Sequence, residues 1–160
     1  MLDEKDSRIL RELERDCRQR TNQIAKQTNL PVTTCHNRIK KLSASGHIAQ
    51  FRAVLDPEKL GKPLLSFVFA TLNRGSPSRS NHTKDSALLA RIASYPCVQE
   101  AHKVSGDWDV LLKIRTSTVH ELNEFISETL QGQRLIDRAQ TYVAMETHKE
   151  TTNLIYNSER

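Results

Sequence analysis

Several features that would assign the chain to other classes of protein are missing from its sequence. No stretch approaches the roughly 18 consecutive apolar residues that a membrane-spanning helix needs. The N-terminal stretch MLDEKDSRIL is acidic and charged, unlike a secretory signal or a transit peptide. The three cysteines, Cys17, Cys35 and Cys97, have no CxxC spacing, which favours reduced thiols over a disulfide framework. We therefore expect a globular, cytoplasmic protein with no membrane partner, built as one domain or two small ones.

Catalytic motifs are missing as well. The six histidines show neither HxxH nor HExxH spacing, and no nucleophile lies in a recognisable elbow between a strand and a helix. Neither the histidines nor the cysteines form a pattern with metal-ligand spacing. We therefore expect no metal site, no cofactor and no enzymatic activity.

The most informative absence is local, because residues 17–55 contain no Asp or Glu. The same window holds seven basic residues: Arg18, Arg20, Lys26, Arg38, Lys40, Lys41 and Arg52. Residues 1–56 contain 11 cations and 7 anions, whereas residues 57–160 contain 13 and 12. Nearly all of the net charge of +5 therefore lies in the first third of the chain. Such an asymmetry indicates a polyanion-binding module joined to a nearly neutral one.

The acid-free window has the pattern of a helix-turn-helix. After a supporting helix over residues 2–16, a second helix is expected over 21–28, with Thr21 as its N-cap. Asn29 is suited to the turn, and residues 32–44 have apolar side chains at the spacing of one helix face. The following stretch HIAQFRAVLD has strand composition and could form a β-wing. The sequence thus predicts a winged helix-turn-helix over residues 1–56.

The polar face of the helix over 32–44 has the chemistry needed to read double-stranded operator DNA. Arg38 can donate two parallel hydrogen bonds to guanine, and Asn37 can pair with adenine. Threonine hydroxyls and Lys41 suit phosphates, which position the helix, and Arg52 is expected near a backbone phosphate. The candidate DNA-binding residues are Thr33, Thr34, Asn37, Arg38, Lys41 and Arg52. A solvated helix face with no partner is the alternative explanation of the same pattern.

Residues 57–63 have the Pro and Gly punctuation of a linker, and residues 64–160 form the second predicted domain. Its expected elements are a strand at 64–72, a helix around 88–92, strands at 97–104 and 108–115, a helix from a capping box at Thr118 to about Gly132, a strand at about 136–147 and a short strand at 153–156. Residues 73–83 are expected to be a polar loop. This order predicts an α+β, ferredoxin-like βαββαβ fold with helices on one face of an antiparallel sheet. The open face, with Phe67 or Phe69, then needs cover, for which a dimer partner is the economical answer.

Several stretches of the chain, in the same order, resemble one family. They are LDEKDSRILREL, LPVTTCHNRIKKLSASG, AVLDPEKLG, LNRGSP, HKVSGDWDVLLKIR and TYVAME. The chain resembles the Lrp/AsnC (feast/famine) transcriptional regulators and is most similar to the bacterial leucine-responsive group. The resemblance implies a winged helix-turn-helix followed by a RAM- or ACT-like ferredoxin-type domain. It also implies dimers that assemble further, often into octamers, and operator binding tuned by an amino acid such as leucine.

The resemblance also implies an effector site between the turn of the hairpin and the late strand of a neighbouring subunit. The corresponding residues are Lys103, Ser105, Gly106, Asp107 and Asp109, with Tyr142, Val143 and Ala144 opposite. An effector ammonium would need a carboxylate such as Asp109, and its carboxylate would need N–H groups in the Gly turn. Without the resemblance, the same residues would be read as an ordinary hairpin turn.

Two residues depart from the family pattern. Pro31 lies where a serine usually caps the recognition helix, and Lys103 lies where an apolar residue is expected. An alternative function is a nucleoid-type architectural DNA-binding protein with little or no effector response. The two functions differ in whether an amino acid changes the oligomeric state or the operator affinity. Both put the protein at the nucleoid.

Overall fold

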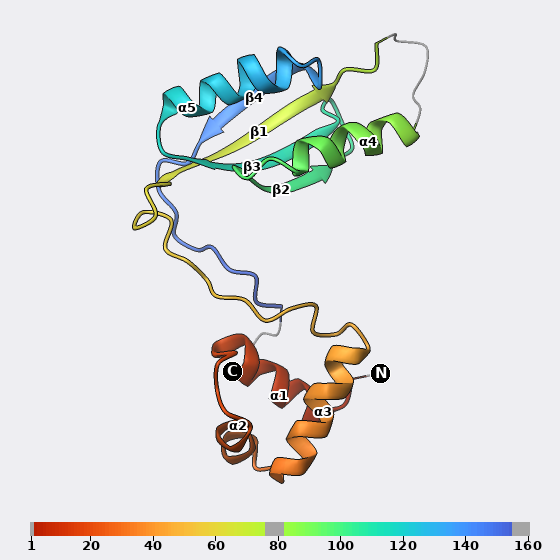
Figure 1. Cartoon of the computed structure of the whole chain (residues 1–160), viewed down its shortest axis with the longest axis vertical. Helices are drawn as coiled ribbons and strands as arrows, with labels where there is room; N and C mark the ends of the chain where they lie inside the picture. Colours follow the sequence, from red (N-terminus) through yellow and green to blue (C-terminus); the bar gives the residue numbers. More distant parts are fainter. Residues whose placement is uncertain (1, 76–81, 155–160) are drawn as a thin grey trace. The chain divides into compact units, whose positions relative to one another are not determined.

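The computed structural model describes residues 2–75 and 82–154 (Figure 1). The chain divides into two compact units. One contains the residues up to Val54 together with the segment that begins at Lys149, and the other is Leu55–His148. Each unit has its own buried apolar cluster, and we describe each by itself.

The first unit contains three helices: α1 (Glu4–Arg15), α2 (Thr21–Thr28) and α3 (Val32–Ala44). Asp3 caps α1, because its side chain accepts a hydrogen bond from the Asp6 N–H while the Asp6 carboxylate accepts from the Asp3 N–H. Asn29 ends α2 in the left-handed conformation, with φ of 54°. These helices and the turn between α2 and α3 confirm the predicted helix-turn-helix.

The N-cap residues of α2 and α3 can be compared with the predicted ones. Thr21 is not the N-cap of α2, because the cap is Arg20, whose N–H donates to the Gln23 side chain at 3.0 Å. The helix covers the expected residues 21–28, but its cap lies one residue earlier than expected. Pro31 is the N-cap residue of α3 and makes no side-chain capping hydrogen bond. A proline has no polar side-chain atom with which to cap a helix.

The three helices pack around one small core. Ile9 and Leu10 of α1, Ile24 and Ala25 of α2, and Cys35 and Leu42 of α3 are buried together. Thr28 is also buried, and its hydroxyl donates to the Ile24 carbonyl at 2.7 Å. Because one side of α3 faces this core, its opposite side remains exposed.

The strand predicted over residues 47–56 is not formed. The described part of the chain has no strand between α3 and the first strand of the second unit. Phe51 and Val54 are 52% and 90% exposed there. Strand composition alone does not form a strand, because the backbone groups need a neighbouring strand for their hydrogen bonds. Within the described residues, the first unit is thus a helix-turn-helix without a β-wing.

The second unit is a four-stranded antiparallel sheet with the strand order β2-β3-β1-β4. The strands are β1 (Leu64–Leu72), β2 (Val98–Lys103), β3 (Val110–Thr116) and β4 (Ile136–Val143). The helices are α4 (His82–Ala93) and α5 (Val119–Glu124), the latter continued by a π-helix at Phe125–Gln131. The order of elements confirms the predicted βαββαβ fold (Figure 1).

The alternation of buried and exposed side chains along β1 shows which face of the sheet is covered. Val68 and Ala70 are fully buried and belong to one cluster with Ile92 of α4 and Leu122 of α5. Phe67 points to the other face and is 36% exposed. Both helices therefore cover the same face of the sheet, and the second face is open within a single chain.

The other boundaries differ modestly from expectation. Thr118 caps α5, but the Glu121 carboxylate accepts the Ser117 N–H at 2.7 Å and not that of Thr118. The last strand ends at Val143, earlier than expected. Residues 153–154 form no strand, and the rest of the strand predicted at 153–156 lies outside the described residues. Most of the loop predicted at 73–83 also lies outside them, and α4 begins at His82.

Candidate functional site

The outward face of α3 carries most of the predicted DNA-binding residues. Thr33, Asn37 and Lys41 are exposed and Thr34 is half-buried, whereas Cys35 on the opposite side is fully buried. His36 and Lys40 are exposed beside them and were missed in the sequence analysis. The helical spacing of Lys40 from Asn37 could have revealed it, because residues three and four apart share a face.

Arg38 lies between the buried and the exposed side of α3, and its side chain is 26% exposed. Its Nη1 donates to Asp3 Oδ2 and to Asp6 Oδ1, both at 2.7 Å. The bonds to Asp6 and Asp3 raise the pKa of Arg38. The pKa of Asp3 is lowered by the Asp6 backbone N–H and by Arg38. We call Asp3, Asp6 and Arg38 the Arg38 triad.

Arg52 is exposed and lies outside the helices, in the segment where a strand was predicted. Its carbonyl accepts a hydrogen bond from Cys17 Sγ at 3.6 Å. Arg52 thus belongs to a separate segment of the first unit, whereas α3 alone carries Thr33, Thr34, Asn37 and Lys41.

The predicted effector turn lies between β2 and β3. Ser105, Gly106 and Asp107 are exposed, and the turn is closed by a hydrogen bond from the Val104 N–H to the Asp109 carbonyl at 2.9 Å. Gly106 has φ of 118°, a conformation that side chains rarely adopt. The turn therefore presents backbone on an exposed edge, where a small anionic group can approach N–H groups.

Asp109 is engaged within the chain. Its Oδ2 accepts the Leu72 N–H at 2.9 Å, and its Oδ1 accepts from Arg74 Nη2 at 2.7 Å. Arg74 also donates to both carboxylate oxygens of Asp85, at 3.0 and 3.1 Å. Lys103 Nζ donates to Asp85 Oδ2 at 3.0 Å. We call Arg74, Asp85, Lys103 and Asp109 the Asp85 cluster.

The Asp85 cluster explains how the chain accommodates Lys103. Asp85 is 3% exposed, and its pKa is lowered to about 2, mainly by Arg74 and then by Lys103. Lys103 therefore has a buried carboxylate as its partner. Neither Arg74 nor Asp85 was among the predicted site residues, since an acidic residue early in a helix is usually explained by the helix dipole.

The second half of the predicted effector site runs along β1 away from the turn, with Tyr142 paired with Phe67 and Val143 with Ser66. The Ala144 N–H donates to the Leu65 carbonyl at 2.9 Å, whereas the Asp109 N–H donates to the Ala70 carbonyl at 3.0 Å. Five residues of a strand span about 16 Å. Within a single chain Ala144 is thus about 16 Å along β1 from Asp109. The exposed Tyr142 lies nearer, because its ring is 5.9 Å from that of Phe69, which is 6.4 Å from Trp108 beside the turn.

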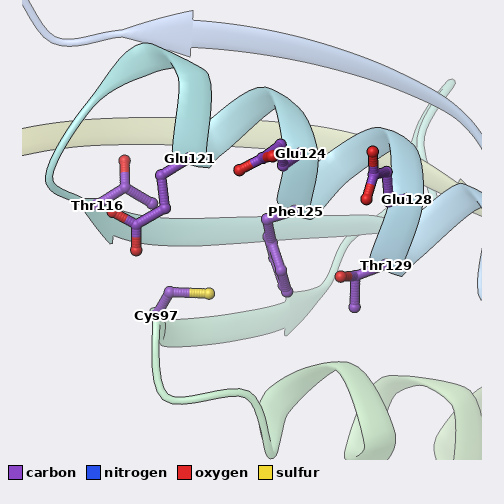
Figure 2. A pocket seen from close by; sticks show the side chains of 7 residues that line it. All are labelled: Cys97, Thr116, Glu121, Glu124, Phe125, Glu128 and Thr129. Carbon is purple, nitrogen blue, oxygen red and sulfur yellow. The ribbon is translucent and has the colours of Figure 1, made fainter.

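One cavity was not predicted (Figure 2). It has a volume of about 320 Å³ and is lined by Cys97, Thr116, Glu121, Glu124, Phe125, Glu128 and Thr129. Figure 2 shows Cys97 below the helix that carries the glutamates. Burial raises the pKa of the Cys97 thiol, and Lys62 holds the pKa of Glu121 at about 2. None of the predicted effector residues lines this cavity.

Within residues 2–75 and 82–154, no group of three His, Cys, Asp or Glu side chains could hold a metal ion. Among the helices of residues 2–75 and 82–154, none combines the length and apolar composition of a membrane span.

Comparisons with known proteins agree on both units. Residues 2–43 match the AsnC-type helix-turn-helix domain, and residues 67–154 match the Lrp/AsnC ligand binding domain. The HTH-type transcriptional regulator FL11 of Pyrococcus horikoshii is 36% identical over 155 residues, which cover 96% of this chain and 95% of FL11. The leucine-responsive regulatory protein of Haemophilus influenzae is 37% identical over 154 residues, which cover 96% and 90%. A transcriptional regulator from Neisseria meningitidis, crystallised as an L-Met complex, is 25% identical and superposes with a TM-score of 0.86 over 96% of both chains.

Proposed function

Because the chain belongs to the Lrp/AsnC family of transcriptional regulators, we propose that the outward face of α3 binds operator DNA and that an amino acid at the β2–β3 turn modulates this binding. The protein is a regulator with a helix-turn-helix domain and a ligand-binding domain, and it is not an enzyme. We assign residues 1–56 to DNA binding, 57–63 to a linker and 64–160 to effector binding and assembly. Its site of action is the nucleoid in the cytoplasm.

The exposed face of α3 supports the DNA contacts. Thr33, Asn37 and Lys41 are exposed on one helix, in a window of residues 17–55 that has no carboxylate side chain. In this proposal Asn37 contacts a base edge, while Lys41 and the threonine hydroxyls contact phosphates. Arg52, also exposed, contacts a phosphate from the segment after α3.

A duplex selected by the wild-type chain from a randomised library tests the DNA contacts. Asn37→Ala should weaken binding by about 1–3 kcal/mol and relax the preference at one base pair. Lys41→Ala should weaken binding to all sequences and reduce the slope of log affinity against log salt by about 1. Lys84→Ala, which removes an exposed cation from the second unit, is the matched control. Unchanged affinity and specificity in the Asn37 variant would remove that residue from base readout.

Amino-acid binding is supported by the match of residues 67–154 to the ligand-binding domain of the family. One relative is named leucine-responsive, and another was crystallised with L-Met. In our proposal the effector carboxylate meets the N–H groups around Gly106, its ammonium faces Asp109, and Lys103, Ser105 and Asp107 surround it. Tyr142, Val143 and Ala144 of a neighbouring subunit supply the apolar wall.

A thermal-shift screen with the twenty amino acids, leucine and methionine included, tests effector binding. A ligand that prefers the native state raises the melting temperature. Asp109→Asn should abolish the shift, and Ser94→Ala, away from the turn, should retain it. A shift retained by Asp109→Asn would contradict the assignment of the ammonium site.

Assembly is supported by the open face of the sheet. Phe67, Tyr142 and Val143 remain partly exposed in one chain, and Ala144 lies about 16 Å along β1 from Asp109. A dimer that associates further, up to an octamer, would cover the face and complete the site. Light scattering after size exclusion measures the mass, and a monomer at micromolar concentration would refute this part.

One observation favours a second candidate function. Both carboxylate oxygens of Asp109 are already hydrogen-bonded, to Leu72 and Arg74, so an effector ammonium must compete with them. An architectural DNA-binding protein without effector response requires no such competition. DNA binding combined with no thermal shift from any of the twenty amino acids would favour the architectural function.

A further inference from the structure

The start of α1 brings two like charges together. Asp3 uses Oδ1 to accept the Asp6 N–H at 2.8 Å, and Asp6 uses Oδ2 to accept the Asp3 N–H at 3.3 Å. The two remaining oxygens, Asp3 Oδ2 and Asp6 Oδ1, both accept from Arg38 Nη1 at 2.7 Å. Each carboxylate therefore caps α1 with one oxygen and binds α3 through the other.

The location of Arg38 makes this arrangement relevant to DNA binding. Arg38 follows Asn37 directly on α3, so the two aspartates approach the flank of the helix that is proposed to face DNA. Without the guanidinium, two carboxylates would repel each other and the DNA phosphates. With it, one positive charge offsets the two negative charges in part, and the triad keeps a net charge of only −1.

The bonds of Arg38 also bear on base readout. Guanine recognition uses two parallel N–H groups of the guanidinium fork. In this protein Nη1 is bound to two carboxylates, and the side chain is 26% exposed. Both bonds thus hold the side chain against the start of α1.

We propose that Arg38 is a positioning residue that joins α1 to α3 and neutralises the α1 carboxylates beside the DNA, and that it does not read a base. Base readout then rests with exposed side chains of α3 such as Asn37. This inference rests on the proposed DNA-binding face of α3 and specifies how that face is held. It replaces the expectation that Arg38 pairs with guanine.

Charge-compensating variants of the full-length chain test the inference. The probe is a duplex that the wild-type chain enriches from a randomised 30-base-pair library. Arg38→Met should lower affinity for this duplex at least about fivefold, because two carboxylates are left unpaired. The triple variant Arg38→Met, Asp3→Asn and Asp6→Asn should regain most of the loss, since asparagine caps a helix as well as aspartate does.

Two further readouts separate positioning from direct contact. The enriched base preferences of the triple variant should equal those of the wild type at every position. Its slope of log affinity against log salt should also be unchanged, whereas the control Lys41→Met should lower that slope by about 1. The control should not be rescued by the two asparagine substitutions.

Other outcomes would overturn the inference. A preference lost at one base pair in Arg38→Met, and not restored in the triple variant, would make Arg38 a base reader. Circular dichroism establishes whether each variant is folded, and the triple variant, which has no unpaired charge, carries the test if Arg38→Met alone unfolds. If the wild-type chain enriches no sequence at all, the proposed DNA-binding face fails, and the inference fails with it.

Discussion

Two arginines in this protein each join a pair of aspartates, and the surroundings of the two groups differ. In the Arg38 triad, the side chains of Asp3 and Asp6 are 51% and 16% exposed. In the Asp85 cluster, the side chain of Asp85 is 4% exposed and Arg74 also binds Asp109. A buried carboxylate that loses its partner has no water to replace it, whereas an exposed one is solvated. The same chemistry should therefore stabilise the second unit strongly and serve mainly to position helices in the first.

The two groups also join different numbers of elements. The Arg38 triad connects the start of α1 to α3. The Asp85 cluster connects α4, the ends of β1 and β2, and the start of β3. Removal of the central arginine should consequently disturb more of the fold in the second unit. This difference can be measured, because the single tryptophan, Trp108, belongs to the second unit and reports on its unfolding.

The largest effect is expected from Arg74→Met. This variant leaves buried Asp85 with Lys103 as its remaining partner and frees one oxygen of Asp109, so the second unit should lose about 3 kcal/mol of stability. Denaturant unfolding followed by Trp108 fluorescence measures the loss. Lys84→Met, an exposed cation on the same helix as Asp85, is the control and should change stability little. Equal losses in the two variants would contradict the role given to burial.

The stability of the second unit in acid should depend on the same cluster. Arg74 and Lys103 lower the pKa of Asp85 to about 2 from 3.8. A carboxyl group whose pKa is lower in the folded state adds stability above its unfolded pKa, and this stability is lost as the pH falls through the folded value. The free energy of unfolding should thus fall by on the order of 2 kcal/mol between about pH 5 and pH 2.

Unfolding curves of the wild type and Asp85→Asn, recorded across that pH range, isolate the contribution of this residue. The variant should be less stable near neutral pH but should lose less stability on acidification. Parallel pH profiles of the two proteins would show that other carboxyl groups cause the decline.

Lys103→Met should have a smaller effect, below about 1 kcal/mol. The lysine side chain is 44% exposed, and Asp85 would keep both of its bonds to Arg74. Combined with Arg74→Met, the loss should exceed the sum of the single losses, because both cations serve one carboxylate. Strict additivity in the double variant would mean that the two cations act independently.

The smallest change in stability is expected from Arg38→Met. Asp3 is half exposed, so water can solvate it when the guanidinium is removed. Asp6 is less exposed but still accepts the Asp3 N–H. The melting temperature, followed by circular dichroism at 222 nm, should fall less than half as far as it does for Arg74→Met. A fall as large as that of Arg74→Met would show that the Arg38 triad also stabilises its unit, and the contrast between the two groups would be lost.

Much of the fold could be predicted because its signals are local. The helix over Val32–Ala44 was predicted with the observed ends, and the order of strands and helices after Leu64 was predicted as well. Helix caps such as Asp3 and Thr118 lie directly next to the helix that they start. Periodic apolar positions lie within the helix or strand itself. The strand predicted after Gly46 does not form, because a strand also requires a neighbouring strand to pair with. The local sequence pattern does not show whether such a partner exists.

The candidate DNA-binding and effector residues were chosen by chemistry and resemblance, and neither reveals partners. Arg38 was selected as a guanidinium on a polar helix face, but its two bonds reach 35 and 32 residues back along the chain. Asp109 was predicted to meet an effector ammonium, yet its carboxylate already accepts from Leu72 and Arg74. Which polar side chains remain available depends on contacts between distant elements.

The helix-turn-helix, the βαββαβ order and the similarity to Lrp/AsnC regulators could all be predicted from the amino-acid sequence. Their signals are charge segregation, helix periodicity and turn residues, which lie within short stretches of the chain and do not depend on packing. Contacts between distant residues, in contrast, determine that Arg38 binds Asp3 and Asp6 and that Lys103 pairs with buried Asp85. They also determine that no strand forms between α3 and β1 within the described residues. Ion pairs and strand pairing join residues that are remote in sequence, and folding alone brings them within reach.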